Sequence, residues 1–239
     1  MTPTLFYGVP QGCSLASIIA LEWLGAPYAL SRIEMLEHPW PAAFARINPQ
    51  NLTPAYVTAE GQLLSESMAI LLHLAAQNGH QLGYPQGSPE HDRLNQTLAY
   101  LATDFFAAFA PLWAAYEMAT DPPRQEALRD WGRPQVAKGC AHLDRLLAER
   151  EWIDGGSRKT VADAYLAAVA RWAEYHGVLR VEDYPHLAAH LAKLRADPAV
   201  VFADAIERQR PATSSGGFQG HVALDDVVAR LHAPSQLPR

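Results

Sequence analysis

Cys13 is the residue of this sequence whose type and position most directly suggest chemistry. It follows the short apolar run 4–8 and immediately precedes a predicted helix over residues 14–25. The unpaired N–H groups and the dipole at a helix N-terminus favour an anion, and therefore lower the pKa of a thiol placed there. The other interpretation is a small residue that fills the loop. Because Pro10 and Ala16 stand where a CxxC pair would need a second cysteine, any redox chemistry here would use one thiol.

A proline and a Ser-Glu-Ser run offer further groups that could bind a ligand. Pro54 lies between a polar loop and a strand-like run, where a cis Thr53–Pro54 bond would leave the backbone N–H and C=O of Thr53 free. Ser65, Glu66 and Ser67 precede a predicted apolar helix. One interpretation is helix capping by Ser65, with Glu66 favourable at the positive end. In the other, the Ser67 hydroxyl and nearby N–H groups bind a carboxylate, and Glu66 binds an ammonium group.

Two polar pairs have the spacing of structural or metal-binding elements. Thr160 and Asp163 are three residues apart, as in a capping box, which indicates a helix start and not chemistry. His186 and His190 are four residues apart, as metal ligands on a helix can be, but no acidic residue or cysteine has a matching spacing. We therefore expect no metal site.

Aromatic side chains allow two roles as well. Tyr7 ends the first predicted strand close to Cys13 in sequence, and either packs in the core or faces the same ligand. The Trp113–Tyr116 pair and the phenylalanines at 105, 106 and 109 have a spacing typical of the buried face of a helix.

The composition indicates a globular protein without a nucleic-acid partner. With 239 residues, of which 49% are hydrophobic and 18% charged, the chain can bury a sizeable core. Its net charge is −6 and no Lys/Arg cluster stands out, which argues against nucleic-acid binding. Two cysteines far apart in sequence suggest no disulfide framework, as expected in a reducing compartment. The N-terminus lacks signal-peptide features and no apolar run approaches about 18 residues, so we expect a soluble cytoplasmic protein without membrane spans.

The first part of the chain alternates between strand and helix patterns. Strands are predicted over residues 4–8 and 28–35 and in a hairpin over 55–66, and helices over 14–25, 40–47 and 67–78. Strands joined through a helix imply a parallel pair, and the late hairpin adds an antiparallel edge. We predict a small α/β domain over residues 1–80.

The rest of the chain reads as helical. Helices are predicted over residues 91–113, 124–150, 160–177, 186–197 and 199–210, after a linker at 81–90. Pro111 should kink or end the first of these helices, and the second should break near Gly132–Pro134. We predict an all-helical domain over residues 91–210. Beyond it lies an extension of unknown role, 211–239, in which 211–220 reads as a flexible linker and 221–232 as a short amphipathic helix.

In their order and spacing, four motifs together resemble the cytosolic glutathione transferases, and the bacterial beta class most closely. The motifs are FYGVPQGCSLAS with Cys13, INPQNLTPAY with Pro54, LLSESMAILLHLA with Glu66-Ser67, and TVADAYLAAVARWA with Asp163. The resemblance covers about residues 4 to 208. It implies a thioredoxin-like N-terminal domain followed by an all-helical C-terminal domain, a homodimer, and glutathione as cosubstrate in a cleft between the domains.

The resemblance also implies roles for single residues. Cys13 falls on the cysteine that contacts the glutathione sulfur and can form a mixed disulfide with it. Thr53 precedes the cis-proline of the family, Pro54, at the place where backbone groups pair with the cysteinyl unit. Glu66 and Ser67 fall on the pair that holds the γ-glutamyl end.

Two positions depart from the pattern of well-known beta-class members. Phe106 stands where those relatives have a histidine near the sulfur, and His38 or its neighbours stand where they have a lysine near the glycyl carboxylate. A phenyl ring cannot donate a hydrogen bond or exchange a proton, but it makes the electrophile side more apolar. We expect Cys13 and Tyr7 to be catalytic, His38 to bind glutathione with Thr53, Pro54, Glu66 and Ser67, and Phe106, Asp104 and Trp113 to line the electrophile site.

The function that these residues favour is transfer of the glutathione thiolate to small hydrophobic electrophiles, without a metal. A glutathione-dependent thiol–disulfide or peroxide reductase that uses Cys13 is one alternative. A binding protein on the same fold, without turnover, is another. Phe106 supports that last alternative, whereas the intact Cys13 and Glu66-Ser67 pair oppose it.

Overall fold

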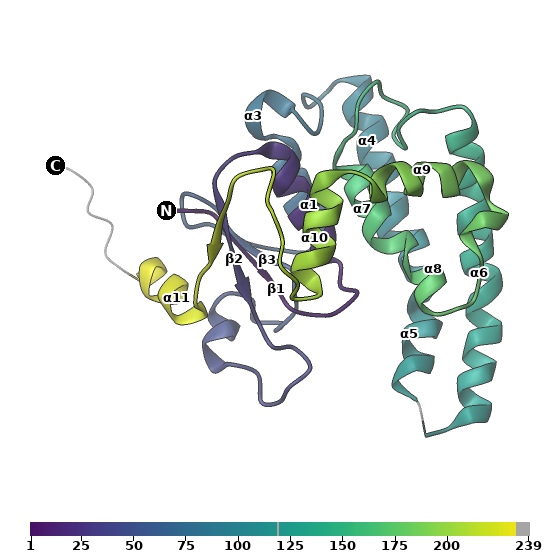
Figure 1. The fold of residues 1–239 in the computed structure, drawn as a ribbon, viewed down its shortest axis with the longest axis horizontal. Helices are drawn as coiled ribbons and strands as arrows, with labels where there is room; N and C mark the ends of the chain where they lie inside the picture. The colour runs from purple at the N-terminus through teal and green to yellow at the C-terminus, as the bar shows by residue number, and fades with distance from the viewer. Residues whose placement is uncertain (119, 233–239) are drawn as a thin grey trace.

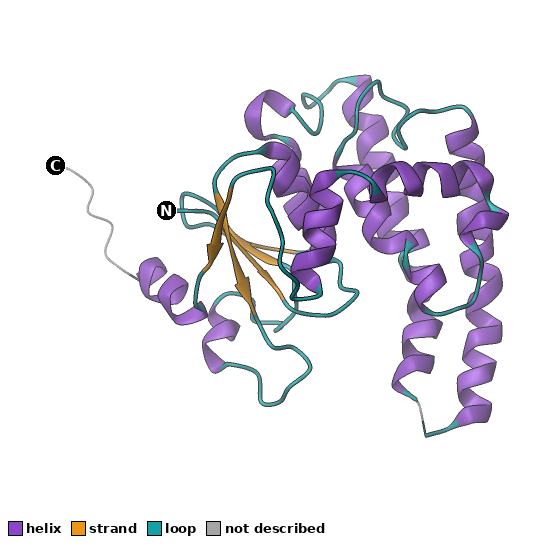
Figure 2. Ribbon diagram, viewed as in Figure 1, coloured by secondary structure: helices purple, strands orange, loops and turns teal. Residues whose placement is uncertain are grey.

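The structure is a computed structural model that describes residues 1–118 and 120–232, and its first part is built on a five-stranded sheet (Figures 1 and 2). The strands are β1 (Thr4–Tyr7), β2 (Tyr28–Arg32), β3 (Ala55–Val57), β4 (Leu63–Ser65) and β5 (Phe218–His221), in the order β4-β3-β1-β2-β5. β1 pairs in parallel with β2 and antiparallel with β3, and β3 pairs antiparallel with β4. The predicted parallel pair with an antiparallel edge is confirmed.

The helices beside this sheet start and stop close to where the sequence predicts. They are α1 (Ser14–Leu24), a 3-10 turn η1 (Ala42–Arg46), α2 (Ser67–Ala75) and α3 (Gln77–His80). Gly25 ends α1 in the left-handed conformation, φ 68°, and its N–H donates to the carbonyls of Leu21 and Glu22. A glycine reaches this conformation at no steric cost, which explains why the apolar run stops there.

Between residues 89 and 207 the described chain contains helices and no strand, as the right-hand part of Figure 2 shows. The elements are α4 (Pro89–Tyr100), the π-helical turn η2 (Leu101–Phe105), the 3-10 turn η3 (Ala107–Phe109), α5 (Ala110–Glu117), α6 (Pro122–Ala148), α7 (Val161–Ala170), α8 (Trp172–Tyr175), the 3-10 turn η4 (Val181–Asp183), α9 (Pro185–Arg195) and α10 (Pro198–Glu207).

Prolines act differently at two places in this half. The helical winding changes just before Pro111, which lies in the first turn of α5, where a missing N–H costs little; the predicted interruption is confirmed. The predicted break near Gly132–Pro134 is wrong, because α6 runs through Pro134 over 27 residues. An added Cβ at Gly132 would come within 2.8 Å of the Leu112 side chain, so this glycine lets α5 and α6 pack closely.

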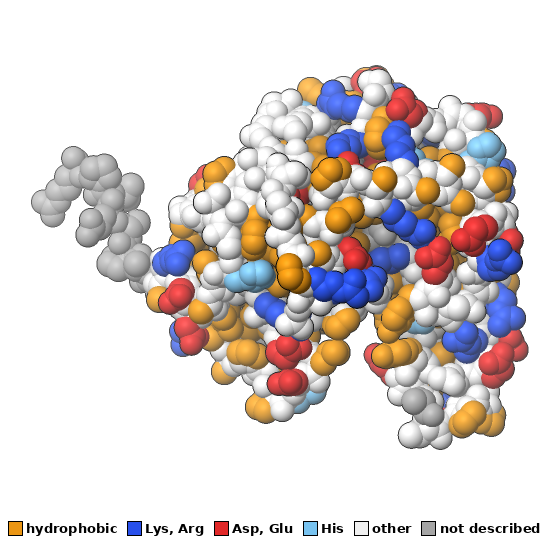
Figure 3. Space-filling view, in the orientation of Figure 1, with side chains coloured by type: hydrophobic (Ala, Val, Ile, Leu, Met, Phe, Trp, Pro, Cys, Tyr) orange, Lys and Arg blue, Asp and Glu red, His pale blue; other side chains and the backbone are white. Residues whose placement is uncertain are grey.

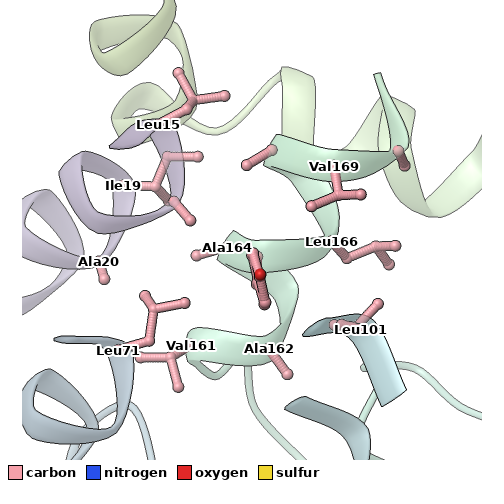
Figure 4. Packing of buried hydrophobic residues seen from close by; sticks show 14 of the residues in the cluster. Leu15, Ile19, Ala20, Leu71, Leu101, Val161, Ala162, Ala164, Leu166 and Val169 are labelled. Atoms are coloured by element: carbon pink, nitrogen blue, oxygen red, sulfur yellow. The ribbon is translucent and has the colours of Figure 1, made fainter. Parts of the chain in front are cut away.

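One continuous core joins the sheet side of the molecule to the helical side. α1 is buried along its whole length, since it packs against the sheet on one side and against α7 and α10 on the other. In Figure 4, Leu15 and Ile19 of α1 face the α7 side chains Val161 and Val169 across this core. The loop between β1 and α1 is therefore held from both halves.

The C-terminal extension is part of the fold. β5 pairs in parallel with β2, so the interpretation of 211–220 as a flexible linker is wrong for its last three residues. The preceding turn is fixed by the buried Glu22 carboxylate, which accepts hydrogen bonds from the Ser214 hydroxyl and from the N–H groups of Ser215 and Gly216. The amphipathic helix predicted at 221–232 is found as α11 (Leu224–His232), at the far left of Figure 1.

α11 covers the sheet face opposite α1. Its Val227 and Val228 are 1% and 6% exposed and pack with Phe6 of β1 and Phe44 of η1 in a second, smaller core. The polar, Gly-containing sequence of β5 concealed this arrangement, because a short edge strand takes its stability from its partner strand and from the helix that follows.

Residues Pro89–Glu117 form a helical stretch of 29 residues that is long and apolar enough to cross a membrane. Its apolar side chains at 94, 98, 101, 105, 109 and 112 are at most 1% exposed, inside the core of the helical half. Burial of this kind is typical of the core helix of a soluble protein.

Candidate functional site

A cleft of about 330 Å³ lies where the sheet side meets the helical side, and it brings together most of the residues singled out in the sequence. Its lining includes Cys13, Thr53, Pro54, Glu66, Ser67 and Phe106. These residues come from the β1–α1 loop, the loop before β3, the start of α2, and the turn after η2. Segments that are far apart in sequence thus meet around one thiol.

Cys13 is the residue immediately before α1, and its side chain is half-buried in this cleft. Burial raises the pKa of the Cys13 thiol to about 11, and the hydrogen bond from the Ser67 side chain and the charge of Arg171 only partly oppose this. The expectation of a thiolate at this helix start is therefore wrong for the ligand-free protein. Loss of hydration outweighs the helix dipole, and Cys13 is a neutral thiol at neutral pH.

The loop that carries Cys13 is held by two consecutive residues at the junction of α7 and α8. The Arg171 guanidinium donates to the Gly12 carbonyl at 3.0 Å, and the Trp172 indole N–H donates to the Gln11 carbonyl at 2.7 Å. Gln11 has a positive φ of 58°, which a non-glycine residue adopts only where its surroundings impose it. The position of the thiol therefore depends on the helical half.

Thr53 presents unpaired polar groups to the cleft. The Thr53–Pro54 bond is cis, as the sequence allows. Among the described residues, neither the backbone N–H nor the C=O of Thr53 has a hydrogen-bond partner, and its buried hydroxyl has none either. An extended ligand beside Thr53 can pair with the backbone groups as a neighbouring strand would.

The start of α2 favours a charged ligand. Glu66 directly precedes α2, with φ 69° and ψ 123°, and makes no side-chain capping hydrogen bond. Ser65 belongs to β4, so its interpretation as the helix cap is wrong. A strained backbone at a cleft is a common mark of a functional residue. It leaves the Glu66 carboxylate exposed and places the free N–H groups of α2, with the Ser67 hydroxyl, beside the cleft.

The opposite wall of the cleft is apolar and aromatic. Phe106 lies there and packs edge-on against Trp172, with ring centroids 5.1 Å apart. Met68 and Tyr165 also line the cleft and were missed in the sequence. Tyr165 lies two residues after Asp163 in a nearly all-buried helix, and a helical projection that began at the capping box could have found it.

Two residues expected to contact glutathione lie elsewhere. The Tyr7 hydroxyl is 2.8 Å from Nε2 of His221 in β5, and Tyr7 lines a different cleft. The expected catalytic role of Tyr7 is therefore wrong, because its hydroxyl pairs with His221 of β5 and lies outside the Cys13 cleft. His38 is exposed and packs on the Trp40 ring, 4.7 Å between centroids, away from the Cys13 cleft.

Two residues expected to line the electrophile site also lie elsewhere. Asp104 is exposed, accepts a hydrogen bond from the Thr103 hydroxyl, and faces the surface of α6. Residues two positions apart point to nearly opposite sides of a helix, so Asp104 and Phe106 do not share a wall. Trp113 packs edge-on against Trp172 at 5.2 Å and so stands behind Phe106, outside the lining.

The capping-box pair and His190 meet in one buried cluster, whereas His186 is exposed and its backbone N–H donates to Asp144. The capping box of Thr160 and Asp163 is confirmed at the start of α7. Asp163 also accepts hydrogen bonds from the Ile153 N–H and from Nε2 of His190, at 3.1 and 2.9 Å. His190 thus serves the buried carboxylate of Asp163, and residues 1–118 and 120–232 contain no group of three or more side chains able to hold a metal.

The chain is similar in sequence and fold to known proteins. Residues 13–77 match the family described as "Glutathione S-transferase, N-terminal domain". The chain is 32% identical to the glutathione S-transferase GstA of Escherichia coli O157:H7 over 199 residues, which are 82% of this chain and 94% of that protein. A sphingomonad glutathione S-transferase complexed with glutathione gives a TM-score of 0.76 at 33% identity, over 86% of this chain and 98% of that one. A bacterial beta class glutathione S-transferase of Sphingomonas chungbukensis gives a TM-score of 0.73 at 29% identity, over 85% of this chain and 98% of that one. The predicted thioredoxin-like domain followed by helices is confirmed.

Proposed function

Because the chain belongs to the cytosolic glutathione transferase family, near its bacterial beta class, we propose that it binds reduced glutathione in the Cys13 cleft. We further propose that it transfers the glutathione sulfur to small hydrophobic electrophiles, in the cytoplasm and as a homodimer. The observation that carries this proposal is the convergence of Cys13, the unpaired Thr53 backbone and the Glu66-Ser67 helix start on one cleft.

The γ-glutamyl end and the cysteinyl unit of glutathione find complementary groups along the cleft. The γ-glutamyl carboxylate accepts hydrogen bonds from the Ser67 hydroxyl and the free N–H groups of α2, and the neighbouring ammonium pairs with the exposed Glu66 carboxylate. The cysteinyl backbone pairs with the N–H and C=O of Thr53. These contacts place the glutathione sulfur next to Cys13.

The chemistry then needs a glutathione thiolate near an electrophile. A neutral Cys13 thiol can donate its S–H to that thiolate, which a Cys13 thiolate could not do. The glutathione sulfur forms a bond to the electrophilic carbon, and the leaving group departs with its electron pair. Phe106 and Met68 give the electrophile an apolar wall. Positioning and electrostatic stabilisation supply the rate enhancement.

The reductase alternative uses Cys13 as a nucleophile. The Cys13 thiolate would attack a disulfide, one sulfur would leave as a thiolate, and reduced glutathione would release Cys13 from the mixed disulfide. The raised pKa of Cys13 disfavours this step, because only the thiolate attacks. The position of Cys13 as a half-buried thiol in the cleft keeps the step sterically open.

Assays of a Cys13→Ala variant separate the functions. We expect the variant to keep measurable conjugation of glutathione to 1-chloro-2,4-dinitrobenzene. Because it lacks the S–H that donates to the glutathione sulfur, the pKa of the bound glutathione thiol should rise. Cys140→Ala, which removes the buried cysteine far from the cleft, is the matched control. The reductase would be favoured if the wild type reduces disulfides, Cys13→Ala does not, and neither protein conjugates glutathione. Glutathione binding without turnover in any assay would favour a binding protein.

A further inference from the structure

Three adjacent parallel strands end in polar side chains on one edge of the sheet. Tyr7 is the last residue of β1, Arg32 of β2 and His221 of β5. Tyr7 and Arg32 are direct partners in the β1–β2 ladder, and β5 runs parallel to β2 on its other side. The carboxyl ends of parallel strands meet at one edge, which is where open α/β sheets bind ligands.

These side chains are connected to one another. The Tyr7 hydroxyl lies 2.8 Å from Nε2 of His221. Arg32 hydrogen-bonds the Tyr7 side chain and also pairs with Glu34 at 3.0 Å. Partial burial and the charge of Arg32 lower the pKa of His221, so this histidine is neutral at neutral pH. The positive charge at this edge therefore comes from arginine.

A second arginine faces the same place. Tyr7, Arg32 and His221 line an open cleft of about 550 Å³ together with Arg210, which follows the end of α10. Among the described residues, the Arg210 side chain has no hydrogen-bond or ion-pair partner. In Figure 3, blue Lys or Arg side chains gather around the place where α10 ends. The cleft thus holds positive charge that the protein itself does not neutralise.

Apart from Gln209, the remaining lining of this cleft is apolar. Ile206 of α10 is 6% exposed, and Val222 follows β5. Both residues line this second cleft. The second cleft and the Cys13 cleft share no lining residue. Residues 221–223 belong to the C-terminal extension, so the cleft exists only because the extension docks on β2.

We propose that this second cleft binds a small organic anion, with its carboxylate or phosphate group between Arg32 and Arg210 and its apolar part against Ile206 and Val222. Guanidinium groups bind planar oxyanions in pairs of parallel hydrogen bonds. A cavity of this volume holds a small ligand, and an apolar lining with a few polar groups is what such sites share. The partly exposed Arg32–Glu34 pair does not prevent binding, because such pairs contribute little and Arg210 is free to pair.

Titration calorimetry of the full chain tests this site with phenyl phosphate, benzoate and neutral phenol as probes. We expect saturable one-to-one binding of at least one of the two anions, no binding of phenol, and the same affinity when glutathione is saturating. The stronger of the two anions identifies the oxyanion. Binding of neither anion at millimolar concentrations, or displacement of the anion by glutathione, would overturn the proposal. Glutathione binding is measured in the same experiment, so failure of this site and failure of the proposed function are distinguishable.

Matched variants assign the binding to the cleft. Arg210→Gln should weaken anion binding about tenfold or more, as expected for loss of a charge-assisted hydrogen bond. Arg208→Gln is the control, because Arg208 is already paired with Asp204 and lies outside this cleft. Ala223→Trp, at an exposed position of the lining, should block binding while all charges remain. Equal effects of Arg208→Gln and Arg210→Gln would contradict the assignment.

Discussion

The guanidinium of Arg171 donates a hydrogen bond of 3.0 Å to the carbonyl of Gly12, the residue immediately before Cys13. The same guanidinium forms an ion pair with Glu207 of α10, in which the two side chains are only 15% and 8% exposed. The Cys13 loop, α7 and α10 therefore meet at one charged group. This contact ties the geometry of the cleft to the packing of the helical half.

Replacing Arg171 with methionine should lower stability and raise the pKa of Cys13 further. The Glu207 carboxylate would remain mostly buried without its partner, a change that costs about 3 kcal/mol. The charge of Arg171 lowers the pKa of Cys13 in the wild type, so its loss disfavours the Cys13 thiolate. Urea unfolding measures the first effect. Adding Glu207→Gln should recover part of the stability, and a variant as stable as the wild type would contradict the buried ion pair.

Alkylation of Cys13 by iodoacetamide should become faster up to a pH of about 11, because burial raises the pKa of its thiol to about 11. The Cys140→Ala background removes the second cysteine. In the unfolded chain the reference value is 9.0, so Cys13 contributes to stability below pH 9 and loses that contribution as the pH rises toward 11. A rate that reaches its plateau below pH 8 would show a thiolate at neutral pH and contradict this assignment.

Replacing Asp163 with alanine should destabilise the chain by about 3 kcal/mol or more. Its fully buried carboxylate accepts hydrogen bonds from the N–H groups of Ile153 and Thr160 and from the His190 ring, all of which would lose their partner. Asp130→Ala is the control, since Asp130 forms only an exposed pair with Arg133 and should cost less than about 0.5 kcal/mol. Denaturant unfolding compares the two, and equal losses would disprove the special role of Asp163.

Replacing Glu22 with glutamine should loosen the C-terminal extension. The Glu22 carboxylate is 4% exposed and accepts hydrogen bonds from Ser214, Ser215, Gly216 and the Tyr28 hydroxyl. An amide offers one acceptor oxygen, so some donors lose their partner. Limited chymotrypsin digestion should cut faster after Phe218 of β5 than in the wild type or in Glu34→Gln, whose carboxylate is exposed and serves Arg32 alone. Unchanged digestion would show that β5 pairing holds the extension by itself.

Local patterns predicted those parts of the fold that depend on nearby residues. The Gly25 helix end and the Thr160–Asp163 capping box follow from residue chemistry within a few positions, whereas the local sequence only allowed the cis bond before Pro54. Part of the Cys13 cleft was predicted through the family resemblance that the order and spacing of the motifs carry, whereas Met68 and Tyr165 were missed. The predicted N-terminal site residues at positions 13, 53, 54, 66 and 67 all line the cleft in the structure.

Predictions that needed long-range geometry were wrong. Tyr7 was assigned to the Cys13 cleft because they are near in sequence, but His221, more than 200 positions away, takes its hydroxyl. Asp104 and Trp113 were expected to line the electrophile site with Phe106, but only the packed helices show that Asp104 faces α6 and that Trp113 packs against Trp172. The neutral state of Cys13 reflects burial in the assembled cleft, and burial is set by tertiary packing.

Calorimetric titration of glutathione into the wild type and the Ser67→Ala variant tests the central claim most directly. The account predicts one glutathione per chain in the wild type and about tenfold or weaker binding in Ser67→Ala, because the γ-glutamyl carboxylate loses a hydrogen bond. Ser65→Ala, two positions earlier and outside the cleft lining, should bind as the wild type does. No glutathione binding at millimolar concentrations, or equal affinity in Ser67→Ala and the wild type, would contradict the account.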